Sequence, residues 1–181
     1  MNTDILIGTI AGDIIGSYYE FVPIKSIDFS LFNGSSSHFT DDTIMTIANA
    51  DWLLTSDSLL GIMQDYGNRY PSSYGNMFYE WLKADNPQPY NSWGNGSAMR
   101  VSPVGWAFNT LEETLEAAKQ SAEVTHNHPE GIKGAQATAS AKVHKQQQLV
   151  YTWLVQVNLN RKLKSILKLY LDIILVEPVT K

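Results

Sequence analysis

The chain of 181 residues contains no cysteine. It therefore forms no disulfide bonds, offers no thiolate ligand to zinc and has no cysteine nucleophile. Any bound metal must be held by oxygen or imidazole ligands. The absence of cysteine suits a reducing compartment, and we expect a cytoplasmic location.

Long apolar runs and a basic N-terminus are also missing. No stretch of about 18 uncharged apolar residues occurs, so the sequence predicts neither a membrane-spanning helix nor a membrane partner. The opening residues, MNTDILIGTIAGD, carry acidic side chains where a secretory signal carries Lys or Arg. Export is therefore not expected.

Positive charge is scarce. Lys and Arg total 13 against 18 Asp and Glu, which gives a net charge of -5. Nucleic-acid binding requires a basic stripe, so we expect no nucleic-acid partner and instead a small-molecule or protein substrate. The 44% of hydrophobic residues suffice for the core of one ordinary domain. Nothing in the composition indicates the oligomeric state.

The composition changes near residue 141. Residues 1–141 hold 6 Lys and Arg and 16 Asp and Glu, whereas residues 142–181 hold 7 and 2. All 12 glycines lie at or before Gly134, and no alanine follows Ala141. The sequence thus divides into a domain over 1–141 and a basic tail over 142–181.

The tail permits two interpretations. Leucine and isoleucine recur at helical spacing between about Asn160 and Leu175, which predicts an amphipathic helix that caps the domain. The alternative is a chain end that has been truncated or shifted in reading frame.

The domain is predicted to be all-α, with helices joined by loops rich in glycine and asparagine. A first helix is expected from Asp4 to about Tyr19, deeply buried because its isoleucines lie on more than one side. Another is expected from Leu111 to Val124, and a further one opens after Pro129.

Glycine recurs every fourth residue in the first predicted helix, at Gly8, Gly12 and Gly16. Such spacing puts the glycines on one strip of the helix, where another backbone or a ligand can come close. We expect close packing along this strip.

The sequence HFTDDTIMTIANADWLL predicts another helix, with Thr40 as its N-cap and Asp41 and Asp42 in its first turn. Capping alone explains these residues. However, a hydroxyl beside two carboxylates is also the oxygen ligand set that Mg²⁺ or Mn²⁺ prefers. Glu20, at the end of the first helix, either projects into the same region or is simply solvated.

The segment SWGNGSAMRVSPVGW, residues 92–106, predicts a cradle for an anion or a sugar. Gly94 and Gly96 flank Asn95 and permit positive φ, which turns backbone N–H groups toward a ligand. Ser97 offers a hydroxyl, and Arg100 could clamp a phosphate. The alternative is a glycine-rich turn into a helix with Arg100 on its surface.

The segment THNHPEGIKGAQATASA, residues 125–141, carries His126 and His128 just before a proline. Two histidines at this spacing lack a third ligand for zinc. Either a histidine contacts a ribose, a phosphate or an acid, or both are ordinary loop residues.

Together, GTIAGDIIGSYYE, FTDDTIMTIANADWLL, GNGSAMRVSPVGW and THNHPEGIKGAQA resemble the ADP-ribosylglycohydrolase family, over roughly residues 3–141. The resemblance implies an orthogonally packed helical bundle with a central cleft. It also implies two Mg²⁺ or Mn²⁺ ions and removal of ADP-ribose from a modified protein side chain or small acceptor.

The resemblance also implies roles for single residues. Thr40, Asp41 and Asp42 match the metal ligands, and Glu20, Asp41 and Asp42 match the catalytic acids. The residues that match the substrate-binding positions are Asn95, Gly96, Ser97, Met99, Arg100 and His126.

One departure concerns the end of the chain. Family members continue to a glycine-rich motif whose two acids and threonine complete the metal site, whereas the tail has no glycine and only Asp172 and Glu177 as acids. The bundle is thus predicted to lack its C-terminal part, which puts the activity of this chain in doubt. The alternative is a non-catalytic remnant of the same fold that binds ADP-ribose or is purely structural.

Overall fold

The computed structural model describes residues 4–141, with side chains from Leu6 onward. All regular structure in this range is helical, which confirms the all-α prediction. The range falls into two compact units, 4–39 and 40–141, each described here by itself. None of the helices in the described range is long and apolar enough to cross a bilayer. The predicted tail helix lies outside the described residues.

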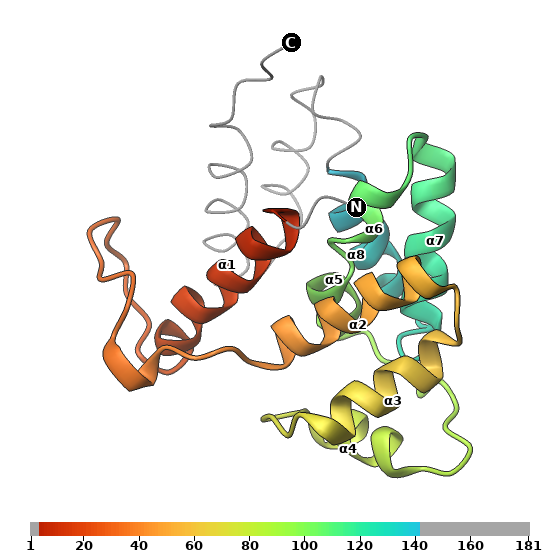
Figure 1. Ribbon diagram of the computed structural model, residues 1–181, viewed down its shortest axis with the longest axis horizontal. Coiled ribbons are helices and arrows are strands. Elements are labelled where there is room, and N and C mark those ends of the chain that lie inside the picture. Colours follow the sequence, from red (N-terminus) through yellow and green to blue (C-terminus); the bar gives the residue numbers. More distant parts are fainter. Residues whose placement is uncertain (1–3, 142–181) are drawn as a thin grey trace. The chain divides into compact units, whose positions relative to one another are not determined.

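The unit of residues 4–39 consists of α1 (Asp4–Phe21), the short 3₁₀ helix η1 (Gly34–Ser36) and the loop between them (Figure 1). Helix α1 confirms the first predicted helix. The loop folds back toward the last turns of α1, where the hydroxyl of Tyr19 donates to the carbonyl oxygen of Ser30 at 2.6 Å.

Burial along α1 differs from the prediction. Ile15 is buried, but 62% of Ile7 is exposed, so the expectation of a deeply buried helix is wrong at this position. A Cβ atom at Gly8 would meet no atom of the described residues within 4 Å, so the close packing predicted for the glycine strip is not found at this position. Apolar side chains on several sides of a helix are buried only where a neighbour packs against them.

The unit of residues 40–141 begins with α2 (Asp41–Thr55), α3 (Leu59–Arg69) and α4 (Asn76–Lys83). The predicted N-cap is confirmed, because the side chain of Thr40 accepts a hydrogen bond from the backbone N–H of Asp42. Helix α2 thereby satisfies one of its free N-terminal donors.

These three helices share one apolar cluster. Its buried members are Ile44, Met45, Ala48, Leu59, Met63, Trp81 and Leu82. Side chains of α3 also hold the end of α4: the Nε2 atom of Gln64 donates to the carbonyl oxygen of Ala84 at 2.9 Å, with longer contacts to those of Trp81 and Leu82. Gln64 therefore satisfies carbonyl groups that a helix end leaves without partners.

We expect Gln64→Ala to lower the free energy of unfolding by about 1–2 kcal/mol, because it leaves the partly buried carbonyl oxygen of Ala84 without its donor. The carbonyl oxygen of Leu82 keeps the side chain of Asn68 as a donor. Urea unfolding followed by circular dichroism measures the change. Gln120→Ala is the matched control, since Gln120 is exposed and donates only to the neighbouring side chain of Glu116. Equal stability of the two variants would contradict the capping role of Gln64.

The chain continues through α5 (Gly96–Arg100), α6 (Val104–Ala107), α7 (Leu111–Glu123) and α8 (Pro129–Ser140). Helices α7 and α8 confirm the two helices predicted for this part of the sequence. The N-cap of α7 is Thr110, whose side chain accepts from the third backbone N–H that follows.

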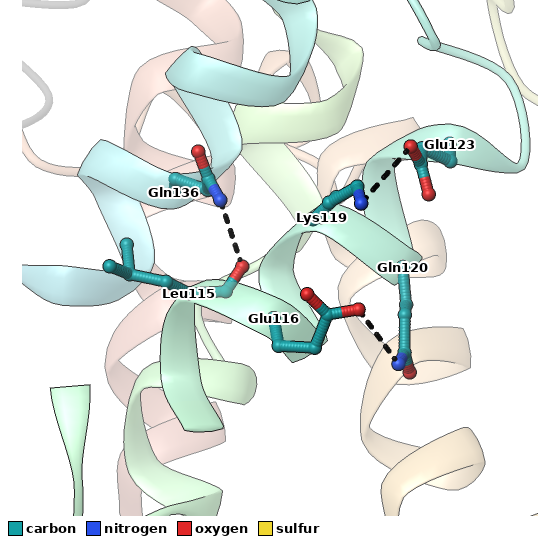
Figure 2. Close-up of polar contacts among 6 residues, drawn as sticks. All are labelled: Leu115, Glu116, Lys119, Gln120, Glu123 and Gln136. Carbon is teal, nitrogen blue, oxygen red and sulfur yellow. Dashed lines mark hydrogen bonds and ion pairs between the residues drawn. The ribbon is translucent and has the colours of Figure 1, made fainter. Parts of the chain in front are cut away.

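Small residues dominate the second apolar cluster, which joins the end of α5 at Val101 to α6, α7 and α8. Its buried members are Val101, Val104, Ala117, Ala118, Ala122, Ala135 and Ala139. Alanine side chains let α7 and α8 approach closely, and Gln136 of α8 donates to the main-chain oxygen of Leu115 in α7 at 3.1 Å (Figure 2). The pairs Lys119–Glu123 and Glu116–Gln120 in the same view lie on the outer side of α7.

A buried polar contact links the two clusters. Asn49 of α2 and Ser121 of α7 are both fully buried, and the Ser121 hydroxyl donates to the Asn49 side-chain oxygen at 2.5 Å. The Asn49 amide nitrogen donates in turn to Met45 of its own helix. This contact fixes the face of α2 that is turned toward α7.

Candidate functional site

The first group of candidate residues lies at the start of α2. The Thr40 hydroxyl accepts from the backbone N–H of Asp42 at 3.3 Å and lies 3.4 Å from its Oδ2 atom. Thr40 is buried, whereas Asp41 and Asp42 are partly exposed. Burial raises the pKa of Tyr74 to about 12, and the negative charge of Asp41 adds to this effect.

The donor chemistry of this group fits a hard divalent cation. Three successive residues supply a hydroxyl and two carboxylates, and the carboxylates reach the surface. A magnesium ion requires about six oxygen ligands, so water or further residues must supply the others. Within residues 4–141 no group of three or more His, Cys, Asp or Glu side chains could hold a metal ion, so the set is incomplete in this range.

The second group combines the glycine-rich loop with the histidine loop. A Cβ atom on Gly96 would lie 2.9 Å from both Cε1 and Nε2 of His126, so only glycine fits against the imidazole ring. The Ser97 hydroxyl donates to the main-chain oxygen of Gly131 at 2.8 Å, which ties α5 to the start of α8. The structure thus brings together two motifs that lie far apart in the sequence.

The reason for the glycines differs from the prediction. Among the described glycines only Gly34 has a positive φ, so Gly94 and Gly96 do not adopt the left-handed conformation. Gly96 is required instead for space, because any side chain would collide with His126.

Two further predicted residues lie on or beside α5. Asn95 is its exposed N-cap residue and makes no side-chain cap hydrogen bond, and its carbonyl oxygen accepts from Ala98 and Met99. Met99 packs against the first apolar cluster, and its own carbonyl oxygen lies 3.4 Å from the hydroxyl of Thr46 in α2. The glycine-rich segment therefore packs directly on α2.

Arg100 lies inside the protein, with only 1% of its surface exposed. Its Nη2 atom donates to the main-chain oxygen of Ser121 at 2.7 Å and to the Oγ1 atom of Thr125 at 2.9 Å. The surface position considered as an alternative is therefore wrong. Burial lowers the pKa of Arg100 to about 10, so the side chain is still charged at neutral pH. No carboxylate pairs with Arg100 among residues 4–141.

His126 is buried beside this charge. Its Nδ1 atom lies 2.7 Å from the Oγ1 atom of Thr125, and its ring lies against that of Tyr90, with 6.0 Å between centroids. Burial and the positive charge of Arg100 lower the pKa of His126 to about 3. The imidazole is therefore neutral at physiological pH and acts as a hydrogen-bonding group rather than as a cation.

The depressed pKa of His126 makes the fold sensitive to acid. The unfolded chain binds a proton at this histidine below its ordinary pKa of 6.5, whereas the folded chain binds it only near 3. The unfolded state thus binds more protons between these values, and stability falls with falling pH by up to about 1.4 kcal/mol per pH unit. Urea unfolding at several pH values should show a shallower pH dependence for His126→Gln than for the wild-type chain. Equal slopes in the two proteins would contradict the buried, neutral histidine.

Two other residues of the sequence analysis, Glu20 and His128, are described each within its own unit. Glu20 is exposed in the last turn of α1, within the unit of residues 4–39, and its catalytic role is still a prediction. His128 is the N-cap of α8, where its Nδ1 atom accepts from the backbone N–H of Glu130.

Sequence reasoning missed Thr125 and Tyr90. Thr125 is fully buried and links Arg100 to His126. Burial raises the pKa of Tyr90, while Arg100 and a hydrogen bond with Thr125 act against this rise. The position of Thr125 directly before the candidate histidine was the one local signal for its role.

Comparison with known proteins gives one family. A model of the ADP-ribosylglycohydrolase family matches residues 3–171, and thus extends beyond residue 141, where the composition changes.

Individual relatives match over most of the chain. ADP-ribosylhydrolase ARH3 of Mus musculus is 28% identical over 165 residues, covering 72% of this chain and 45% of that protein. The Homo sapiens protein of that name is 26% identical over 165 residues, with 72% and 46% covered. That of Danio rerio is 28% identical over 166 residues, with 75% and 45% covered. The chain therefore spans about half the length of the curated relatives it matches.

Proposed function

Because the chain belongs to the ADP-ribosylglycohydrolase family, we propose that it forms part of a metal-dependent hydrolase that removes ADP-ribose from a modified protein side chain or a small acceptor. The observation that supports this best is the packing of His126 directly on Gly96, which joins two of the family-like motifs in one place.

Thr40, Asp41 and Asp42 would hold a Mg²⁺ or Mn²⁺ ion at the start of α2. Their oxygen atoms match the ligands that these ions prefer. When bound, such ions supply electrostatic stabilisation of a ribose oxygen or of the attacking water. Neutralisation of either carboxylate removes part of this ligand set.

The glycine-rich segment and His126 would bind the nucleotide sugar. Asn95 is exposed at the start of α5, with Gly96 next to it against the imidazole. Ser97 is fully buried and bonded to Gly131, so it would hold this loop in place rather than contact the ligand.

The proposed reaction replaces one bond at the anomeric carbon of ribose. The bond from this carbon to the acceptor nitrogen or oxygen breaks with oxocarbenium character. The oxygen of water then bonds to the carbon, one water proton goes to the acceptor atom, and the other stays on the new hydroxyl. Glu20 is the candidate for moving the proton.

Release of ADP-ribose tests the proposal. The 181-residue chain is incubated with ADP-ribosyl-arginine or ADP-ribosyl-serine peptides and Mg²⁺, and free ADP-ribose is quantified by chromatography. We expect release from one of these linkages and its loss when EDTA removes the metal. Binding of ADP-ribose without release would instead indicate a binding module. If the chain neither binds nor releases ADP-ribose, the result would indicate a structural role and contradict the proposal.

A further inference from the structure

Three buried side chains form a chain of hydrogen bonds that ends at the candidate site. Arg100 Nη2 lies 2.9 Å from Thr125 Oγ1, and the same oxygen lies 2.7 Å from His126 Nδ1. All three residues are at least nine-tenths buried. These hydrogen bonds therefore run through the interior of the protein, away from competing water.

The chemistry of the three groups limits which of them donates and which accepts in each hydrogen bond. An arginine only donates, so Arg100 occupies an acceptor position on the Thr125 oxygen. Donation from a cation polarises a hydroxyl group and makes its hydrogen a better donor to the next acceptor. Arg100 fills only one of the two acceptor positions on the Thr125 oxygen, and Thr125 also bonds Tyr90, so its hydrogen goes either to Nδ1 of His126 or to Tyr90. The 2.7 Å contact favours donation to Nδ1. A neutral imidazole that accepts at Nδ1 carries its hydrogen on Nε2.

The Nε2 edge of the ring faces the glycine-rich loop. The Cβ position of Gly96 lies 2.9 Å from Nε2, and that of Gly94 lies 3.9 Å from it. In the described part of the chain Nε2 has no hydrogen-bond partner. Among the described residues the fully buried side-chain nitrogen and oxygen atoms without a partner are Trp81 Nε1 and Arg100 Nε, so Nε2 of His126 is not closed off from solvent. An oxygen atom of a ligand on the loop can therefore reach it and accept its hydrogen.

We propose that Arg100 and Thr125 are positioning residues that hold His126 as the neutral tautomer with hydrogen on Nε2, so that it donates a hydrogen bond to an oxygen atom of the substrate. Neither residue needs to touch the ligand. The inference deepens the proposed function and rests on it for the identity of that oxygen, which would belong to ADP-ribose.

The charged and titratable neighbours agree with this assignment. The ring of Tyr90 packs against the imidazole of His126, and Arg100 is the charged group that acts on it. Burial and the Arg100 charge lower the pKa of His126 to about 3. Protonation at both nitrogens would put a second cation beside Arg100, in a place where water screens it poorly. The ring should keep one tautomer across the physiological pH range.

The tautomer is measurable in the wild-type chain by long-range ¹H–¹⁵N NMR of histidine side chains, with His126→Gln to assign the signal. We expect a pyridine-like Nδ1 and a pyrrole-like Nε2 that do not change between about pH 8 and pH 5, where an ordinary histidine titrates. A hydrogen on Nδ1, or titration near the ordinary pKa, would overturn the proposal. A hydrogen on Nδ1 would mean that Thr125 donates elsewhere, for example to Tyr90.

Variants of Thr125 test the relay, by which we mean the two hydrogen bonds that lead from Arg100 through Thr125 to His126. Thr125→Val keeps the size of the side chain but removes the hydroxyl, so the signals should change to mixed tautomers. Thr125→Ser keeps the hydroxyl and should keep the wild-type spectrum. An unchanged spectrum in folded Thr125→Val would show that the relay does not set the tautomer. Should Thr125→Val not fold, the wild-type spectrum and Thr125→Ser still decide.

Binding of ADP-ribose, measured by calorimetry, then connects the tautomer to the ligand. We expect Thr125→Val to weaken binding about five- to tenfold, the effect of one lost hydrogen bond, and Thr125→Ser to bind like wild type. Equal binding by both variants would contradict the role of Nε2 as a donor to the ligand. If wild type shows the predicted tautomer but does not bind ADP-ribose at all, the relay stands and the proposed function fails.

Discussion

Asp41→Asn and Asp42→Asn are each expected to reduce ADP-ribose release by about 100- to 1,000-fold, the usual effect of removing one electrostatic contact to a transition state. Each change keeps the size of the side chain and replaces one charged oxygen of the cluster at the start of α2. The measurement is the initial rate of release at saturating Mg²⁺, with far-ultraviolet circular dichroism as the check on folding.

Asp57→Asn is the matched control for these two variants. Asp57 is exposed in the connection between α2 and α3, and it takes no part in the proposed site. Its rate should stay within twofold of wild type. Full activity of Asp41→Asn and Asp42→Asn would place the metal, or the chemistry, elsewhere.

Gly105→Ala is expected to lower the free energy of unfolding by about 2–3 kcal/mol, toward the upper end of the range for overpacked cores. A Cβ atom at Gly105 would lie 2.5 Å from the main-chain oxygen of Ala139. Relief requires α6 or α8 to move, because the colliding atom belongs to a helix backbone and not to a flexible side chain.

Gly61→Ala provides the comparison for this stability effect. Gly61 is exposed in α3, and an added Cβ would meet no atom closer than 3.9 Å. Alanine also favours the helix over glycine by up to about 1 kcal/mol, so this variant should equal or exceed wild-type stability. The measurement is the urea midpoint of each variant. A midpoint of Gly105→Ala equal to or above that of Gly61→Ala would mean that α6 and α8 do not pack as closely as described.

Local signals predicted four of the described helices, α1, α2, α7 and α8, and where they start. The N-cap Thr40 and the paired acids that follow it are readable from the sequence because capping depends on residues only two or three positions apart. Pro129 and the segment after Thr110 predicted the starts of α8 and α7 for the same reason.

Long-range packing accounts for what the sequence did not predict. Nothing near Arg100 in the sequence indicates that its partners are Ser121 and Thr125, which belong to α7 and the loop after it. Likewise, Gly96 was expected to supply a positive φ, whereas it supplies space for His126. Contacts between segments distant in sequence decide these roles.

The most direct test asks whether the oxygen cluster at the start of α2 and the loop around His126 serve one ligand. Mn²⁺ is added to the chain with bound ADP-ribose, and the broadening of the two phosphorus NMR signals by the paramagnetic ion is measured. The account predicts strong broadening in the wild-type chain and little in Asp41→Asn. Phosphorus signals of bound ADP-ribose that Mn²⁺ leaves sharp in the wild-type chain would contradict it.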